Sequence, residues 1–560
     1  MTNAELITKQ YSSSTAFWFA AVILVAMRLA LGSDLAVEII YSPHDDSLYV
    51  ERAWHLLSGE AFGAYGNRIL IKYPGISIWL AGVRVLGIPF LISVNALYIG
   101  TGIYLLAALL RGGINRWIAL SAFVLYLFNP ITYGIEWMRV IREPLDTGLL
   151  VLMVAAIAHV IVSVDQGRRP WTHLAVFALT FAFSMFVREE NRLLWGLLVL
   201  FVGALWWQAI HAKRHGALVV VAVALLVPSA LAKGYEFGLR DFVERHYGLP
   251  IIHEFGEGQF PRLLAAIRSV RSSKDNRLVM VSQETLRKLR KEVPAFAPVI
   301  DKLPLPGAGT FSCRYQGVCS EWANGWMPFW IADGAFRAGL APNLVAAQAY
   351  YRKVRLGIEA ACAEGRLKCT QKGEGFLAPM ELRWTRAFVA EGWRLAKMLF
   401  APDTRPISEV PAVYDVPVEL GRIYQAVTMT SNFDSLAHEN LGSGTDIPRY
   451  VSPIAASARG ALLAPYQFVA ALLLLAMIVA LAIRLWIADQ APLGPMALLG
   501  LVVMVYGLLR VAALTYVAVY LGPFTSRIVF STYAVTVPLA LPFIAETIVA
   551  WTKIRKSVKT

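Results

Sequence analysis

Two adjacent carboxylates, Asp45 and Asp46, follow the first long apolar run of the chain by only a few residues. Arg68 and Lys72 add positive charge later in the same polar stretch. A carboxylate can take a proton from an attacking hydroxyl group, and Lys or Arg can hold a phosphate leaving group. If a membrane lies beside them, these acidic and basic side chains together suit the transfer of a group from a lipid that carries a phosphate. Lys72 could alternatively be an interfacial lysine whose ammonium group reaches back to water.

A second polar stretch gathers charges of both signs before another apolar run. Arg139 and Arg142 are further candidate ligands for a donor phosphate, and Glu143 and Asp146 are candidate supporting acidic groups. These two acidic residues lie where the apolar run begins, and charges at that depth usually face an aqueous cavity or pair with one another. The two arginines could instead simply pair with Glu136 and these carboxylates.

Other charged and aromatic groups are weaker candidates. The stretch VREENR at 187–192 is interpreted as a solvated turn rather than a site. Arg240 and Arg527 could approach the same region from other segments. Tryptophans recur every four residues at Trp322, Trp326 and Trp330, which would form one stripe on a helix. Such a stripe is more often core or membrane anchor than a surface for stacking on sugars.

The composition shows what must position these side chains. The chain is 57% hydrophobic and 16% charged, with a mean hydropathy of +0.54, which excludes an ordinary soluble protein. We predict an all-α polytopic membrane protein, because apolar runs of spanning length recur along the chain. The ten predicted spans are 15–33, 93–110, 117–133, 146–164, 172–187, 193–210, 217–233, 462–484, 493–519 and 525–549. One further apolar run, 73–91, is broken by Gly and Pro and is predicted to lie in the interface without crossing.

Loop charge predicts the orientation. The net charge is +14, and the short loops 111–116, 165–169 and 211–215 and the tail 553–560 are all basic. Lys and Arg favour the cytoplasmic side, so these segments and the N-terminus are predicted inside. The two candidate loops and the large polar stretch then lie outside. No basic tract with interleaved aromatic residues indicates a nucleic-acid partner.

The chain is predicted to divide into three parts. Residues 1–233 form a transmembrane module with external loops at 37–93 and 134–146, residues 234–460 a mainly helical external domain, and residues 461–560 the last helices. All four cysteines, Cys313, Cys319, Cys362 and Cys369, lie in the external domain. This placement favours two disulfides in an oxidising compartment. Local pairing is the simplest of three connectivities, and a zinc site is the less favoured alternative.

Several short motifs occur in a fixed order along the chain and make it resemble a known protein family. They are D-D-x-x-Y at 45–49, A-x-x-L-x-x-G at 53–59, K-Y-P-G at 72–75 and R-E-P-L-D at 142–146. In order and placement they resemble the GT-C superfamily of membrane glycosyltransferases, nearest the protein mannosyltransferase and aminoarabinose-transferase-like branch. The resemblance covers residues 10–230 and leaves the external domain unassigned.

The resemblance implies roles for individual residues. Asp45 matches the acidic residue that acts as general base or orients the acceptor, and Asp46 takes the second acidic place. Lys72 matches a lysine that contacts the lipid phosphate, and Asp146 matches the second-loop acidic residue. The pair is often Asp-Glu in the family, and the lysine is often followed directly by Pro-Pro, whereas Tyr73 intervenes here.

These features together predict a glycosyltransferase of the bacterial inner membrane. Its donor would be a polyprenyl-phosphate-linked sugar, and its acceptor a periplasmic glycan, lipid or protein. The sequence leaves open whether a divalent ion, Mg or Mn, binds the acidic pair. One alternative is a ligase or polymerase of the O-antigen kind, which moves whole glycans from a lipid diphosphate. A transporter is another, although it would favour charges near the membrane midplane, and an envelope scaffold is a third.

Overall fold

The computed structural model describes most of the 560 residues. The described residues are 3–66, 68–211, 215–271, 276–307, 312–313, 317–370, 380–402, 404, 413–414, 416–430, 452–487, 490–491, 493–522 and 526–557. Within these ranges the chain is almost wholly helical, which confirms the predicted all-α class. The strands described are β1 (Ile39–Ile40) and β2 (Val413–Tyr414), which pair in parallel with Ile39 opposite Val413.

Among the described residues, seven helical stretches are long and apolar enough to cross a membrane. They belong to α4 (Phe90–Arg111), α7 (Arg142–Asp165), η2 with α9 (Glu189–Leu193 and Leu194–His211), α10 (His215–Tyr247), α20 (Pro453–Trp486), α21 (Pro495–Leu521) and η5 with α22 (Ser526–Val529 and Phe530–Ser557). The protein is therefore a multi-pass membrane protein.

The other three predicted spans coincide with helices whose apolar parts are shorter. These are α1 (Asn3–Leu31), which is apolar from Thr15, α5 (Arg116–Leu127) and α8 (Trp171–Ser184). α5 ends well before the predicted residue 133, because Pro130 starts the short 3₁₀ turn η1 (Pro130–Tyr133). The short helix α6 (Ile135–Met138) follows it. The total of ten spans remains a prediction.

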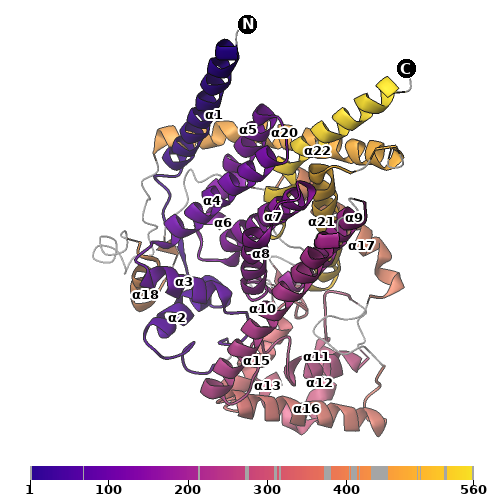
Figure 1. Cartoon of the computed structure of the whole chain (residues 1–560). Helices are drawn as coiled ribbons and strands as arrows, with labels where there is room; N and C mark the ends of the chain where they lie inside the picture. Colours follow the sequence, from indigo (N-terminus) through magenta and orange to yellow (C-terminus); the bar gives the residue numbers. More distant parts are fainter. Residues whose placement is uncertain are drawn as a thin grey trace.

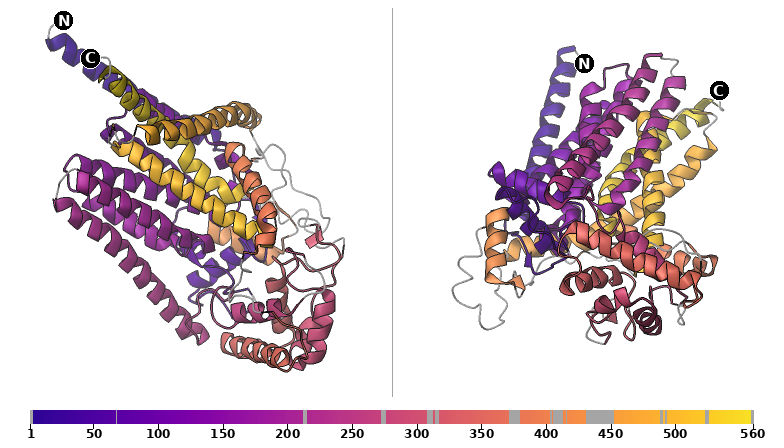
Figure 2. Two further views of the ribbon diagram at one scale, coloured as in Figure 1. Left: turned by 90° about the vertical axis from the view of Figure 1, so that its right-hand side faces the viewer. Right: turned by 90° about the horizontal axis from the view of Figure 1, so that it is seen from below.

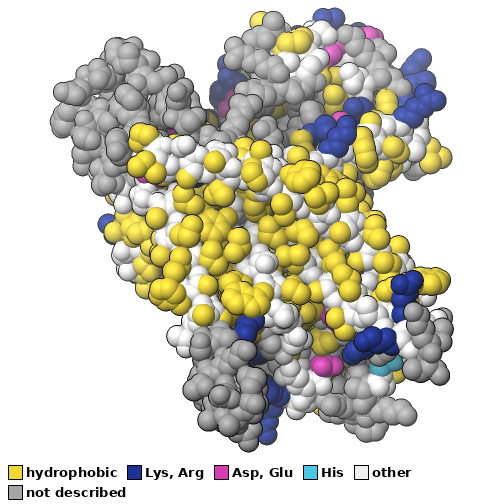
Figure 3. All heavy atoms as spheres, turned by 90° about the horizontal axis from the view of Figure 1, so that it is seen from above, with side chains coloured by type: hydrophobic (Ala, Val, Ile, Leu, Met, Phe, Trp, Pro, Cys, Tyr) yellow, Lys and Arg dark blue, Asp and Glu magenta, His cyan; other side chains and the backbone are white. Residues whose placement is uncertain are grey.

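The middle of the bundle is α7, which is buried along almost its whole length. It packs against α4, α8 and α22, and small residues such as Gly148 and Ala155 let neighbouring helices approach closely. By contrast, α10 and α20 expose many large apolar side chains, among them Leu226, Phe237 and Phe468. Apolar side chains cover the middle of the face in Figure 3, with Lys and Arg toward its margins. Such a surface suits contact with lipid.

A small group of helices closes one end of the bundle. α11 (Phe260–Ser269), α12 (Gln283–Glu292), η3 (Pro294–Phe296), α13 (Ala297–Ile300), α15 (Met327–Arg337) and α16 (Leu344–Ala363) share one hydrophobic core. We call this group the cap. Both chain termini lie at the opposite end of the bundle (Figures 1 and 2). Two local disulfides, Cys313–Cys319 and Cys362–Cys369, confirm the simplest pairing.

Residues 234–460, the polar stretch predicted as one external domain, pack against several different parts of the structure. α10 runs past the predicted end of its span at residue 233 and ends at Tyr247. After the cap, the turn η4 (Leu382–Trp384) leads into α17 (Thr385–Phe400), which packs on α21. α18 (Val418–Thr428) packs on α2 (Asp46–Leu57) and α3 (Gly75–Val85). Parts of this stretch thus belong to the bundle and to the first loop.

The non-crossing run predicted at 73–91 contains α3, whose eleven residues are about 16 Å long at ~1.5 Å per residue, too short for a bilayer. Its first residue, Gly75, donates its main-chain N–H to the carbonyl of Phe186 at 2.8 Å. A Cβ atom at Gly75 would lie only 2.5 Å from that oxygen. The close approach locks the segment after Lys72 against the turn that follows α8.

Candidate functional site

Asp45 lies at the start of α2, at the cap end of the bundle, where the helix N-terminus favours a negative charge. Its Oδ1 atom forms an ion pair with the Lys72 ammonium group, and the Tyr49 hydroxyl donates to the same oxygen at 3.5 Å. The Asp45 side chain is 21% exposed. The structure therefore brings together the acidic and basic residues that the first-loop motifs singled out, and leaves the carboxylate accessible.

Asp46 has a different environment, because its side chain has no exposed surface. Arg139 Nε donates to Asp46 Oδ1 at 3.1 Å, and Arg139 Nη2 donates to Oδ2 at 2.7 Å. Arg139 also donates to Glu136 at 3.2 Å. Burial raises the pKa of Asp46 to about 6, and Arg139 opposes the rise, so Asp46 is ionised at neutral pH. This geometry makes Asp46 the residue that fixes Arg139.

Arg527, in η5, faces this site from the last span. Its guanidinium lies 3.8 Å from Asp45 Oδ2, 3.6 Å from Glu136 Oε2 and 3.5 Å from Glu143 Oε1. These separations exceed the ~2.7–2.9 Å of a charge-assisted hydrogen bond, and the side chain is 29% exposed. Arg527 is thus a cation held loosely among three carboxylates. The sequence signal was weak, an arginine near the start of the final apolar run.

The cations around Asp45 control its charge. Burial alone would raise the pKa of Asp45, but Lys72, Arg527 and Arg142 together hold it well below its ordinary value. The carboxylate is therefore ionised throughout the physiological range. Any group that draws these cations away would raise the pKa of Asp45 and make it a better proton acceptor.

The structure corrects the interpretation of VREENR as a solvated turn. Arg188 and Asn191 are 3% and 1% exposed. Glu189 forms an ion pair with Arg142, and Arg188 pairs with Glu190. Residues 187–191 are buried or half-buried because they pack between the start of α7 and the loop before α3, whereas Arg192 is exposed. Arg142 therefore pairs with Glu189 and not with the carboxylates of its own segment.

Asp146 lies one turn further along α7, in a closed cluster. Asn191 Nδ2 donates to Asp146 Oδ1 at 2.8 Å, and Arg510 Nη2 of α21 donates to Oδ2 at 3.2 Å. The side chains of Asp146 and Arg510 are 4% and 1% exposed. We call these three residues the Asp146 cluster. Arg188 links it to the site, at 4.0 Å from Asp146 and 3.5 Å from Glu143.

Arg68, a predicted phosphate ligand, is not paired with the site carboxylates: among the residues that the structure describes, no carboxylate lies within 4.0 Å of it in an ion pair. It lies near His44 instead. Burial, together with the positive charges of Arg68 and Lys72, lowers the pKa of His44 to about 4. His44 is therefore neutral at physiological pH.

The cap reaches the site through aromatic side chains. The His44 ring lies 4.7 Å from the Phe329 ring and 5.9 Å from the Trp326 ring, between centroids. The tryptophans of 322–330 do not form one helix face, because α15 begins only after Trp326. Trp322 belongs to the core of the cap. Trp326 alone of the three reaches the residue beside Asp45.

A cleft of about 300 Å³ opens next to the site, between α8, α9 and α10. Its lining combines apolar and charged side chains: Tyr73, Met185, Phe186, Arg192, Trp195, Ala232, Lys233, Glu236 and Glu257. The Arg192 and Lys233 side chains are 60% and 70% exposed. Arg240 pairs with both Glu236 and Glu257 at 2.9 Å. Arg240 thus belongs to this rim and not to the Asp45 site.

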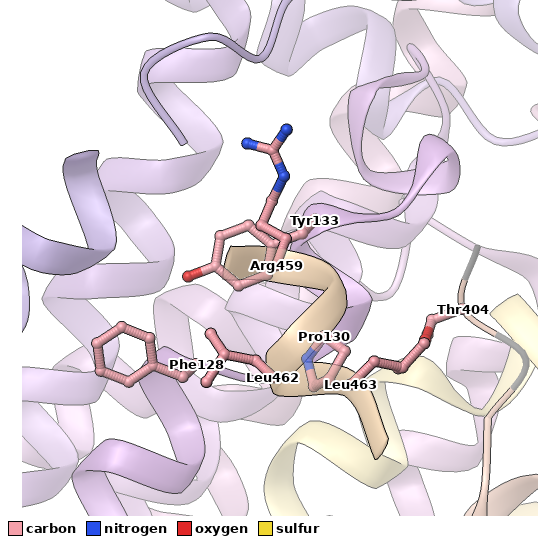
Figure 4. Close-up of a pocket in the computed structure, with 7 residues that line it drawn as sticks. All are labelled: Phe128, Pro130, Tyr133, Thr404, Arg459, Leu462 and Leu463. Atoms are coloured by element: carbon pink, nitrogen blue, oxygen red, sulfur yellow. The ribbon is translucent and has the colours of Figure 1, made fainter. Parts of the chain in front are cut away.

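A much smaller cavity, of about 10 Å³, lies between η1 and α20 near Arg459 and Tyr133 (Figure 4). This volume holds about one water molecule and excludes a substrate. Arg459 donates to Asp34 at 2.6 and 3.0 Å, so its charge is already compensated. The cavity is a packing feature where α20 meets the loop after α5.

The described residues contain no group of three or more His, Cys, Asp or Glu side chains placed to hold a metal ion. The acidic pair is instead engaged by basic side chains, Asp45 by Lys72 and Asp46 by Arg139.

No model of a known protein family and no curated protein matches this chain. Two solved structures match it at 13% identity, both of ArnT from Cupriavidus metallidurans. The apo structure covers 94% of this chain and 78% of its own, with a TM-score of 0.29. The structure bound to undecaprenyl phosphate covers 92% and 77%, with a TM-score of 0.28. At these TM-scores the likeness carries no argument about this chain's fold or function.

Fold and site together define a class. This is a helical multi-pass membrane protein with an accessible, ionised carboxylate at one end of its bundle, where basic side chains from three separate segments surround it.

Proposed function

We propose that this protein is a membrane glycosyltransferase that moves a sugar from a polyprenyl-phosphate donor to an acceptor hydroxyl. One observation carries the proposal: Asp45 is a partly exposed carboxylate whose two nearest cations, Lys72 and Arg527, come from distant segments and converge on it. A proton acceptor and a surplus of positive charge are what displacement of a phosphate by a hydroxyl requires.

The proposed step is a single displacement at the anomeric carbon, which inverts its configuration. The acceptor oxygen forms a bond to that carbon while the bond from the carbon to the phosphate oxygen breaks. The electron pair of the broken bond stays on the phosphate, and polyprenyl phosphate leaves. The acceptor proton passes to Asp45.

The ion pair between Lys72 and Asp45 couples donor binding to base strength. A donor phosphate would compete with Asp45 for Lys72 and Arg527, since both cations lie within reach of the same space. Once they turn to the phosphate, the pKa of Asp45 rises toward its ordinary value. Asp45 would then become an effective base only when the donor is present. Asp46 and Glu136 would hold Arg139 in position beside this space.

The cleft between α8, α9 and α10 supports a lipid donor. Its apolar side chains suit the first isoprene units, and the exposed Arg192 and Lys233 at its rim suit a negatively charged head group. Tyr73 lines the cleft directly after Lys72 in the chain. A donor in the cleft would therefore have its phosphate close to the segment that carries Lys72.

The compartment is also part of the proposal. The cap and the site lie at the end of the bundle opposite both termini, and the basic-loop pattern predicts the termini in the cytoplasm. With two disulfides in and beside the cap, this end fits the periplasmic side of a bacterial inner membrane. The acceptor would then be a periplasmic glycan, lipid or protein.

The test is to identify the lipid that co-purifies with the protein in mild detergent, by native mass spectrometry. Lys72→Gln removes the charge but keeps a side chain of similar length. The matched control is Lys288→Gln, at an exposed cap lysine that pairs with Glu284. We expect polyprenyl phosphate or its sugar on the wild type and control, and about tenfold less on Lys72→Gln, the loss of one charge-assisted hydrogen bond.

Two outcomes would contradict the proposal. Bulk phospholipids alone, equal in all three proteins, would leave the site without a lipid donor and would favour a transporter. A lipid diphosphate carrying a whole glycan would favour the ligase or polymerase alternative.

A further inference from the structure

The loop that carries Lys72 is fastened to the cap. We call residues 58–74, between α2 and α3, the lysine loop. The main-chain N–H of Glu254 donates to the carbonyl of Leu70 in this loop at 2.7 Å. The Glu254 carboxylate accepts from the Tyr65 hydroxyl of the same loop at 3.1 Å, and from Gln348 of α16 at 3.1 Å. A single buried residue, 2% exposed, thus joins the loop to a cap helix.

Apolar contacts join both members of the ion pair to the same body. Leu48, one turn after Asp45 on α2, and Ile71, directly before Lys72, are each 2% exposed. Both side chains belong to the hydrophobic core of the cap. Asp45 and Lys72 are therefore each close in sequence to a side chain that belongs to the core of the cap. His44, before Asp45, adds the ring contact with Phe329.

The other end of the lysine loop is held by α10. The Tyr247 hydroxyl, at the end of that helix, accepts from the Phe62 N–H at 3.1 Å and donates to the Gly63 carbonyl at 2.8 Å. Arg52, fully buried on α2, donates to the Lys72 carbonyl at 3.0 Å. The loop therefore has anchors along its length, from α10 and α2 as well as from the cap side.

We propose that the cap holds the Asp45–Lys72 ion pair in its geometry, and that Leu48, Ile71 and Glu254 are the positioning residues through which it does so. The inference rests on the proposed function for its kinetic readout. A misplacement of reacting groups by about 1 Å can cost about a hundredfold in rate, so a loosened loop affects transfer far more than it affects folding.

A matched pair of truncations tests this proposal. Ile71→Ala and Ile331→Ala each delete a buried isoleucine from the same core, but Ile331 lies in α15, within the cap itself. We expect Ile71→Ala to lower transfer per folded molecule by about tenfold or more, while Ile331→Ala lowers only the unfolding temperature. The milder Ile71→Val and Ile331→Val form a second pair should either alanine variant fail to fold.

A second readout does not depend on transfer. The Lys72 side chain is only 14% exposed in its ion pair, so its rate of modification by an amine-reactive label reports how well the pair is held. We expect Ile71→Ala and Glu254→Ala to speed labelling of Lys72 by about tenfold, with Ile331→Ala unchanged. Glu254→Gln, which can still accept from Tyr65 and Gln348, should label as the wild type does.

The outcomes separate the two proposals. Faster labelling in Ile71→Ala with no transfer in the wild type would support positioning by the cap and contradict the proposed function. Equal transfer and equal labelling in Ile71→Ala and Ile331→Ala would overturn the positioning role, whatever reaction the protein performs.

Discussion

The Asp45 site and the Asp146 cluster are made of the same residue types, yet they are built differently. Asp146 has two close partners, Asn191 at 2.8 Å and Arg510 at 3.2 Å, and almost no exposed surface. Asp45 is partly exposed, and Arg527 stays 3.8 Å away. In the closed cluster each charge compensates the other permanently. At the open site the cations remain available for another negative group.

This difference in exposure and in partner distance suggests that the Asp146 cluster stabilises the fold, whereas the charges at the Asp45 site serve the reaction. A buried ion pair is costly to desolvate and is strongly destabilising when one partner is removed. The Asp45–Lys72 pair keeps some exposed surface, so water can partly replace a lost partner, and we expect its loss to cost less stability than a loss in the closed cluster. Mutation should therefore affect stability in the Asp146 cluster and activity at the Asp45 site.

The largest expected effect is loss of transfer in Asp45→Asn. The amide cannot accept the acceptor's proton, so we expect activity to fall by about a thousandfold, with a smaller loss of stability than in Asp146→Leu. The measurement is consumption of a labelled lipid-phosphate sugar in membranes that contain the native acceptors. Asp241→Asn is the control, because Asp241 is an exposed residue of α10 that pairs with Arg245. Full activity in Asp45→Asn would refute its role as base.

The closed cluster should respond in the opposite manner. Asp146→Leu leaves Arg510 buried without its carboxylate, which we expect to lower the free energy of unfolding by about 3–5 kcal/mol. Denaturant unfolding in detergent measures the loss. The double variant Asp146→Leu with Arg510→Met should recover much of it, because Arg510 is then no longer a buried charge without its carboxylate. A single variant as stable as the wild type would show that the cluster is not structural.

The smallest effect concerns pH and compares the two members of the acidic pair. The pKa of Asp46 is raised to about 6, so below that pH Asp46 gains a proton and its hold on Arg139 weakens. Asp45, whose pKa is held low, stays ionised. We expect transfer to decline several-fold as the pH falls through about 6. Asp46→Asn should have lower activity without this decline, and an unchanged decline would assign it to another group.

Periodicity and loop charge predicted the class of the fold and most of its long helices. The first-loop motifs singled out both Asp45 and Lys72, and the structure pairs the two side chains although α2 separates them along the chain. Their roles in a reaction stay a prediction. Arg527 and Glu189 could not be assigned in this way. Their partners come from distant segments, and only tertiary packing decides which charge meets which.

The division of the polar stretch was harder to foresee for the same reason. The sequence of this stretch does not indicate which surface each of its helices covers. In the structure α17 packs on α21, and α18 packs on α2 and α3. An apolar stripe on a helix can pack against any complementary apolar surface, so the sequence pattern alone does not identify the helix that it will contact.

The contact at Gly75 also limits how this sequence can vary. No side chain fits between α3 and the Phe186 carbonyl, and even a methyl group would require the turn after α8 to retreat. Because that turn also carries Glu189, the partner of Arg142, a retreat would disturb the site. Homologues that keep the Asp45–Lys72 pair should therefore keep glycine at this position. An alignment in which it varies freely while the pair is retained would show that the helix and the turn are packed differently in those proteins.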